Sequence, residues 1–196
     1  VVDAYSKAYD VEFDECKKSG GFTSFDDFFT RELRDGVRVF PEDERTIISP
    51  SDGRLDSIGP IDGRTYTVKG RPYSVAELIG DEMDAKRYEG GYGCVVYLSP
   101  RDYHRVHAPV AGKIALVRSM EGDYYPVNEM GVKFVPNLFV RNRRVAIVID
   151  TPKESGLGRV TVVMVAAMVV GRLTVTGIEA RDVPFGVSHL SAPLAV

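Results

Sequence analysis

Apolar residues at the start of the chain repeat with the period of a helix. They fall at positions i, i+3, i+4, i+7 and i+8, the spacing of a single apolar helix face. The pattern therefore predicts a short amphipathic helix that docks on a core through this face. The residues at this spacing are Val1, Ala4, Tyr5, Ala8 and Tyr9.

A second helix is predicted after the break at Gly20-Gly21. Ser24 followed by Asp27 is a capping-type start. The helix is expected to end at Asp35-Gly36. Its aromatic stripe is best explained by core packing, which is how such helices usually dock. The apolar positions at helical spacing are Phe25, Phe28, Phe29 and Leu33.

After Pro41 the pattern changes to short runs rich in valine, tyrosine and threonine, separated by glycine. Such runs predict strands. One short helix interrupts them, with Ser74 and Glu77 as a capping box and Gly80 as its end. Several runs are apolar without alternation, which indicates strands buried on both faces or in a closed sheet. The predicted strands are Thr65–Val68, Gly93–Leu98, Lys113–Val117, Val145–Ile149, Val160–Val170 and Leu173–Ile178.

These elements together predict an α+β fold, mainly a β barrel or sandwich with a helical N-terminal segment. The length of 196 residues suggests one domain over 1–196. Within it we expect the helical segment at 1–40 and the β core at 41–196.

The composition is that of a soluble globular protein, with 44% hydrophobic and 27% charged residues. A net charge of -3 gives no basic field that would attract nucleic acid. The two cysteines, Cys16 and Cys94, have no metal-like spacing and predict neither a disulfide framework nor a metal site. The longest apolar run, Val160–Val170, is too short to span a bilayer. Because the chain starts at Val1, we expect a fragment or a processed product, and peripheral membrane contact stays open.

The segment Pro100–Gly112 concentrates residues capable of chemistry. It holds two of the three histidines, His104 and His107, beside an acid, a tyrosine and two arginines. Histidine is the side chain best suited to proton transfer near neutral pH. The plain alternative, two exposed imidazoles in a turn, is the commoner one for an isolated His-x-x-His. Zinc fits poorly because only the distant His189 could be a third ligand.

Two further stretches could contribute to a site. Asp52 lies in the turn Ser49–Arg54, which either faces solvent or holds a carboxylate against a histidine to fix its tautomer. The basic run Pro136–Arg144 could hold an anion or be a solvated loop. Ser188 and Ser191 have no motif around them and are weak candidates for a nucleophile.

Five stretches, in order along nearly the whole chain, resemble the phosphatidylserine decarboxylase family. The Asp-Tyr-His-Arg-x-His piece is the most specific of them. The matching stretches are Phe28–Leu33, Ser49–Gly53, Leu98–Pro109, Tyr125–Asn128 and Pro136–Asn142.

The resemblance implies a self-processing enzyme that converts phosphatidylserine to phosphatidylethanolamine and CO2. In this family a serine near the C-terminus attacks its own preceding peptide bond and becomes a pyruvoyl group on a short α chain. The long β chain would correspond to the present sequence. By position, Asp52 would be the triad acid, His107 the triad base and His104 the group that assists decarboxylation.

The resemblance also implies partners and a location. Expected partners are the α chain with its pyruvoyl cofactor, a phospholipid substrate, an anionic membrane surface and a second copy of the chain. A peripheral position on the cytoplasmic face of a membrane follows from the same resemblance. No metal is expected. As substrate-binding residues we predict Tyr103, Arg105, Arg141 and Asn142.

The sequence departs from the family pattern at its end. None of the 19 glycines is followed by serine, so the Leu-Gly-Ser-Thr-like motif is absent. Arg143 also stands where many members carry an acidic residue. The chain is therefore expected to be a β chain without its last residues, a truncated form or an inactive relative. The alternatives to the enzyme are a non-catalytic lipid-binding or membrane-binding relative and a metal-dependent hydrolase using His104, His107 and His189.

Overall fold

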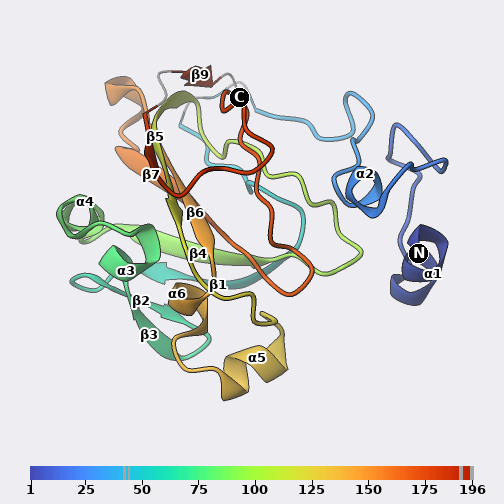
Figure 1. Ribbon diagram of the computed structural model, residues 1–196. Helices are drawn as coiled ribbons and strands as arrows, with labels where there is room; N and C mark the ends of the chain where they lie inside the picture. Colours follow the sequence, from blue (N-terminus) through green and yellow to red (C-terminus); the bar gives the residue numbers. More distant parts are fainter. Residues whose placement is uncertain (42, 44, 190–191, 195–196) are drawn as a thin grey trace. The chain divides into compact units, whose positions relative to one another are not determined.

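The computed structural model describes residues 1–41, 43, 45–189 and 192–194 (Figure 1). The chain forms two compact units, which are described separately below. The first unit comprises Val1–Ile58 and Cys94–Val110. The second comprises Gly59–Gly93 and the described chain from Ala111 onward.

The first unit contains both predicted N-terminal helices, α1 (Val2–Tyr9) and α2 (Phe25–Phe29). The Ser24 side chain accepts a hydrogen bond from the backbone N–H of Asp27, as the capping pattern predicts. Tyr5 of α1 packs against three aromatic rings of α2, and Phe28 is completely buried. The aromatic stripe thus forms a core, as predicted.

Helix α2 is shorter than predicted. It ends at Phe29, whereas the sequence pattern extended it through Leu33. Leu33 instead forms a β-bridge with Cys16. The backbone N–H of Lys17 donates to the carbonyl of Glu32 at 2.8 Å. This pairing gives the backbone an alternative to helical hydrogen bonds, so the prediction was wrong over 30–35.

The second unit is built on an antiparallel sheet in the order β7-β6-β5-β8, with β9 also pairing with β5. Strand β6 lies in the middle and is buried on both faces, as its unbroken apolar run predicts. The strands are β5 (Gly112–Met120), β6 (Arg144–Asp150), β7 (Arg159–Val165), β8 (Gly186–Ser188) and β9 (Ala192–Leu194).

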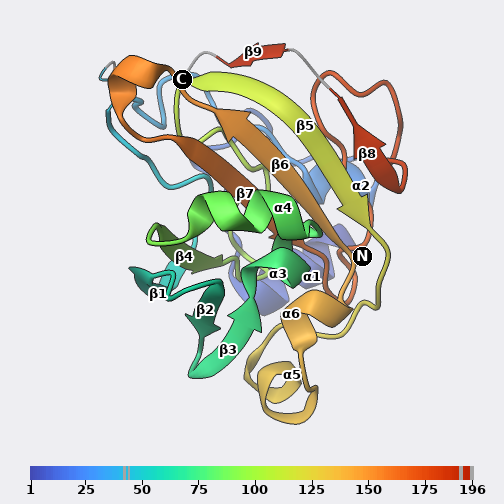
Figure 2. The same cartoon turned by 90° about the vertical axis from the view of Figure 1, so that its left-hand side faces the viewer.

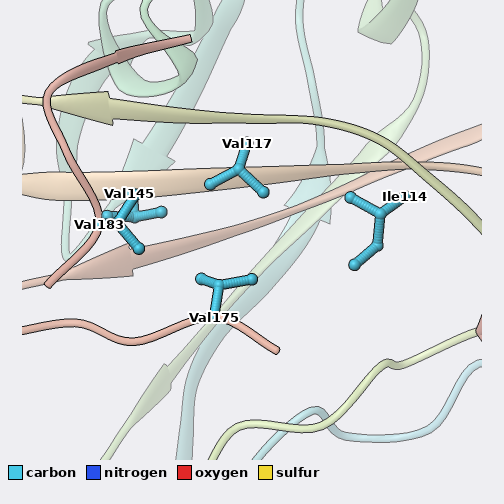
Figure 3. Close-up of a cluster of buried hydrophobic side chains, with 5 residues drawn as sticks. All are labelled: Ile114, Val117, Val145, Val175 and Val183. Atoms are coloured by element: carbon cyan, nitrogen blue, oxygen red, sulfur yellow. The ribbon is translucent and has the colours of Figure 1, made fainter. Parts of the chain in front are cut away.

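One face of this sheet carries a hydrophobic cluster (Figure 3). Two of its members, Val175 and Val183, come from irregular chain after β7. The predicted strand Leu173–Ile178 is therefore wrong, although Val175 packs as a core residue. Strand β7 also ends earlier than predicted. The other members of the cluster are Ile114, Val117 and Val145.

Short helices lie over the sheet of the second unit, with α3 and α4 in front of the strands in Figure 2. Helix α3 begins after Ser74, whose side chain accepts from the N–H of Glu77, and ends at Gly80 with φ 75°. Both boundaries of α3 match the prediction.

The second unit also contains a hairpin of two short strands and several short helices. The strands are β2 (Thr65–Val68) and β3 (Arg71–Ser74), and the helices are α3 (Val75–Ile79), α4 (Glu82–Ala85), η1 (Lys86–Tyr88), α5 (Glu129–Phe134), α6 (Leu138–Arg141) and η2 (Lys153–Ser155).

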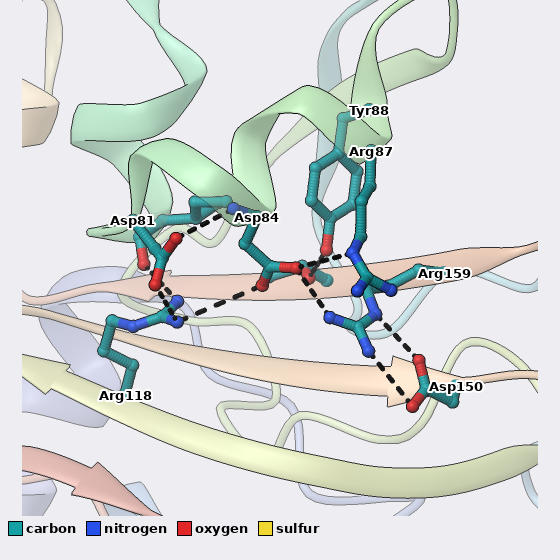
Figure 4. A network of polar contacts seen from close by, with 9 residues as sticks. Asp81, Asp84, Arg87, Tyr88, Arg118, Asp150 and Arg159 are labelled. Atoms are coloured by element: carbon teal, nitrogen blue, oxygen red, sulfur yellow. Dashed lines mark hydrogen bonds and ion pairs between the residues drawn. The ribbon is translucent and has the colours of Figure 1, made fainter.

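An ion-pair network ties α4 to the sheet (Figure 4). Asp84 lies 2.6 Å from Arg159 Nη1 and 4.0 Å from Arg118 Nη2. Arg159 also pairs with Asp150, and Arg118 with Asp81. The Asp84 and Arg118 side chains are each only 8% exposed, so each charge depends on its partners for stabilisation.

The fold class is α+β, as predicted. The strands form separate sheets: β1 (Arg54–Pro60) with β4 (Tyr92–Tyr97), β2 with β3, and the larger sheet. Among the described residues the larger sheet has β7 at one end and β8 and β9 at the other, and it does not close into a barrel. In the part of the chain that the structure describes, no helix has the length and apolar character needed to cross a membrane.

Candidate active site

The two sequence stretches that carry the candidate triad residues lie side by side in the first unit. The backbone N–H of Ile48 donates to the carbonyl of Pro109 at 2.9 Å. The N–H of His107 donates to the carbonyl of Pro50 at 2.7 Å. Together these hydrogen bonds hold the turn that bears Asp52 beside residues 100–110, the loop that carries His104 and His107 and is called the histidine loop below.

Gly53 fixes the other side of this turn. Its φ is 137°, in the region that favours glycine. A Cβ at this position would lie 2.5 Å from the carbonyl oxygen of Tyr97. The glycine in Ser49–Gly53 is therefore required by a close approach between two backbone segments, in addition to the turn itself.

Asp52 is held by an arginine. Arg38 Nε lies 3.0 Å from Oδ1 of Asp52, and Arg38 Nη2 lies 2.6 Å from Oδ2. Arg38 Nη2 also pairs with Glu15 at 2.8 Å. The hydrogen bonds to these two carboxylates raise the pKa of Arg38 and lower the pKa of Glu15. The bidentate geometry fixes the direction of the Asp52 carboxylate.

His107 is exposed at the surface and bonds to a tyrosine. Its Nε2 lies 2.9 Å from the Tyr103 hydroxyl. Burial raises the pKa of Tyr103, so the hydroxyl stays protonated and can donate. Partial burial lowers the pKa of His107, and the positive charge of Arg105 lowers it by a smaller amount. The negative charge of Asp52 acts in the opposite direction and raises it. Among the described residues, no hydrogen bond joins Asp52 to His107.

His104 has a different environment. Its ring is half-buried, with its centroid 3.9 Å from that of Phe29. Nδ1 lies 2.8 Å from the backbone carbonyl of Asp102. Because a carbonyl only accepts, Nδ1 must carry the hydrogen, which leaves Nε2 with its lone pair in the neutral ring. Burial lowers the pKa of His104 and so favours this neutral form.

The four predicted substrate-binding residues fall into both units. Tyr103 and Arg105 belong to the histidine loop, and Arg105 is exposed, with Nε donating to the Thr30 carbonyl at 2.7 Å. Arg141 belongs to the second unit and pairs with Asp123 at 3.0 Å, its guanidinium 4.8 Å from the Tyr125 ring centre.

Asn142 has the contacts of a structural residue. It is completely buried, and its amide bonds the backbone N–H and carbonyl of Tyr125 and the carbonyl of Ala166. Its assignment to substrate binding stays a prediction that these contacts do not support. The neighbouring Arg143 pairs with Asp182, and Arg144 donates to four backbone carbonyls. Both are bound within the protein, so of the three arginines in the basic run only Arg141 is an exposed candidate for an anion.

Two arginines of the first unit were not predicted as site residues. Arg38 holds Asp52, and Arg31 donates to the carbonyls of Arg101 and Asp102 beside His104. Arg31 lies within the family-like stretch Phe28–Leu33, which was the one available signal.

The remaining candidates are His189, Ser188 and Ser191. His189 is exposed, Ser188 ends β8, and Ser191 lies outside the described residues. No cluster of three or more His, Cys, Asp or Glu side chains in the described chain is arranged to hold a metal ion. Nothing in these residues supports the metal-dependent alternative.

Comparison with known proteins decides the family. The phosphatidylserine decarboxylase family model matches residues 25–188. The chain belongs to the phosphatidylserine decarboxylase family. The match confirms the resemblance seen in the sequence motifs and includes Asp52 and both loop histidines.

Curated relatives carry the name phosphatidylserine decarboxylase proenzyme. One from Acinetobacter baumannii (strain AYE) is 40% identical over 173 residues, which are 87% of this chain and 60% of the relative. One from Shewanella pealeana is 38% identical over 176 residues, 88% of this chain and 60% of the relative. One from Anaeromyxobacter sp. (strain K) is 40% identical over 171 residues, which are 87% of this chain and 59% of the relative. The chain thus spans about 60% of the length of these family members.

Proposed function

We propose that this chain is the β subunit of a self-processing phosphatidylserine decarboxylase. Family membership supports the reaction. The observation that carries the assignment of residues is the backbone pairing of Pro50 with His107, because it holds the Asp52 turn beside the histidine loop. Asp52 and His107 would activate a downstream serine, and His104 would act in decarboxylation.

For self-cleavage, His107 has to take a proton from the serine hydroxyl. Its lowered pKa keeps the ring neutral near pH 7, as a base must be. Tyr103 occupies Nε2 in this chain, and Arg38 occupies both oxygens of Asp52. We infer that Asp52 acts on His107 by its charge until the serine segment is in place and displaces Tyr103 from Nε2.

A pyruvoyl group, carried by the separate α chain, supplies a carbonyl that draws electrons from an amine substrate. The side chains of this chain fit that chemistry, because His104 offers a neutral ring whose Nε2 has no hydrogen-bond partner among the described residues. His104 Nε2 would take up a proton and deliver it to the substrate carbon after CO2 leaves. Its lowered pKa makes the protonated ring a stronger acid and so favours delivery.

Several finer assignments belong to the same proposal. The substrate would be a phospholipid, with Tyr103, Arg105 and Arg141 as candidate contacts. The enzyme would work as a peripheral protein at an anionic membrane surface on the cytoplasmic side, as a dimer of processed subunits. A barrel or sandwich formed by the complete single domain also stays a prediction.

Intact mass of the complete encoded protein tests self-processing. We expect two chains, the shorter with a blocked N-terminus derived from serine. His107→Ala and Asp52→Asn should leave the protein uncleaved. His104→Ala should be cleaved normally and decarboxylate about 100-fold more slowly, since general acid–base groups contribute roughly 10²–10⁴-fold.

His189→Ala is the matched control and should be cleaved and active like the unchanged protein. A His107→Ala protein that processes normally would remove His107 as the base. An unchanged protein that is never cleaved and carries no carbonyl cofactor would favour the non-catalytic relative.

A further inference from the structure

Arg31 is a buried cation that contacts both the histidine loop and helix α2. It is only 6% exposed. One nitrogen, Nη2, donates to the carbonyl of Arg101 at 2.8 Å and to that of Asp102 at 3.2 Å. The guanidinium carbon lies 5.5 Å from the centre of the Phe28 ring. Arg31 thus joins α2 to the residues just before His104.

The Asp102 carbonyl is shared. It accepts from Arg31 Nη2 and lies 2.8 Å from His104 Nδ1. Phe29, two residues before Arg31, packs on the His104 ring with 3.9 Å between centroids. The position and tilt of the His104 imidazole therefore depend on one short segment, 28–31. This segment supplies Phe29, whose ring packs on His104, and Arg31, which binds the Asp102 carbonyl that accepts from His104.

Stability alone does not account for this arginine. Its Nε and Nη1 are buried and have no hydrogen-bond partner among the described residues. A buried guanidinium with unbonded N–H groups is costly compared with an apolar side chain of similar length. A function that needs a charged donor directed at two carbonyls by a planar group explains the residue better than packing does.

We propose that Arg31 is a positioning residue that clamps the Arg101 and Asp102 carbonyls, so that His104 is held as the Nδ1–H tautomer with Nε2 free for proton transfer. The inference deepens the proposed function and rests on it for the identity of the proton transfer. The charged and titratable groups facing His104 are Arg31 and Asp102. Arg31 lowers the pKa of His104 and Asp102 raises it, with burial as the largest cause of the net lowering.

Nitrogen NMR of the imidazole rings tests the proposal in the complete encoded protein labelled with ¹⁵N-histidine. The His104 signal is assigned with His104→Gln. In the unchanged protein we expect the Nδ1–H form and a pKa below the ordinary value. Arg31→Met should raise the pKa of His104 and shift the ring toward the Nε2–H form that free histidine favours.

Two further variants separate the charge from the geometry. Arg31→Lys keeps the charge but not the planar guanidinium that directs Nη2 at the two carbonyls, so the His104 tautomer should be less strictly held, while the pKa of His104 rises less than in Arg31→Met. It also serves if Arg31→Met does not fold. Arg34→Met is the matched control, because Arg34 is exposed and donates to the Asp14 carbonyl. It should leave the His104 signal unchanged.

Kinetics give a second readout. Misplacement of a catalytic group by about 1 Å can cost on the order of 100-fold. For Arg31→Met we therefore expect kcat to fall roughly 10-fold to 100-fold and KM to change by less than about twofold. An unchanged His104 tautomer and pKa in Arg31→Met and Arg31→Lys would overturn the proposal, and so would a loss confined to KM. If the unchanged protein does not decarboxylate, the proposed function fails, and the NMR result still decides the role of Arg31.

Discussion

Replacing Gly53 with alanine should test how the Asp52 turn is held. The added Cβ would lie 2.5 Å from the Tyr97 carbonyl oxygen and 3.2 Å from Val96 Cγ1. Since the first of these contacts is with backbone, a side-chain rotation cannot relieve it. Overpacking of this kind costs about 1–3 kcal/mol. A positive φ in a residue with a Cβ adds about 1–2 kcal/mol.

We therefore expect Gly53→Ala to lose about 2–5 kcal/mol of unfolding free energy. For a chain of this size each kcal/mol corresponds to about 2–4 °C, so a loss of 3 kcal/mol lowers Tm by roughly 6–12 °C. Thermal and urea unfolding measure the change. Because the strain falls next to Asp52, self-cleavage of the complete protein should also slow, as intact mass over time would record.

Gly36→Ala is the matched control within the same unit. Gly36 has φ 80°, and no atom lies within 4 Å of its virtual Cβ. It therefore isolates the backbone term, about 1–2 kcal/mol. Equal losses for the two variants would refute the steric argument. So would a Gly53→Ala protein that unfolds within about 0.5 kcal/mol of the unchanged one.

Two further predictions concern ion pairs in the second unit. Asp84→Asn should lower the free energy of unfolding in urea by about 3–5 kcal/mol, because Arg118 and Arg159 lose a shared carboxylate, while Glu82→Gln, at an exposed side chain, should change it by less than about 0.5 kcal/mol. The hydrogen bond from Arg143 lowers the pKa of Asp182 below its usual 3.8. Its stabilisation is therefore fully present above pH 3.8 and is lost as the pH falls through the lower folded value. Asp182→Asn should lower Tm more at pH 7 than at pH 2; an equal effect at both pH values would contradict the linkage.

Local signals in the sequence predicted the element boundaries that depend on local chemistry. Ser24, Ser74 and Gly80 each act within three or four residues, so their cap roles could be predicted from the sequence. The predictions that were wrong concern segments whose structure depends on contacts with residues far away in the sequence. Leu33 is not helical because its backbone forms a β-bridge with Cys16. Val175 packs in the core without strand hydrogen bonds, because burial alone does not require a strand.

The candidate active site also contains residues that the sequence motifs indicated and residues that only the fold revealed. The family-like motifs indicated Asp52, His104 and His107, and the backbone pairing brings their loops together. The sequence did not indicate Arg31 and Arg38, whose acceptors lie 70 and 14 residues further along the chain. An arginine in an irregular segment is usually solvated, and only the fold shows that these two are bound. For the basic run near Arg141, the sequence left an anion site and a solvated loop open. Arg143 and Arg144 instead bind acceptors within the protein.

The two histidines of one short motif owe their different properties to different neighbours. His104 lies under Phe29 with Nδ1 fixed by a backbone carbonyl, so its tautomer is determined by main-chain geometry. His107 is exposed, and its Nε2 lies 2.9 Å from the hydroxyl of Tyr103. A fixed tautomer suits a group that repeats one proton transfer at every turnover. An exposed ring suits a group that, in our proposal, is needed once, when the serine segment reaches Nε2 of His107. The contrast supports giving cofactor formation to His107 and decarboxylation to His104, and not the reverse.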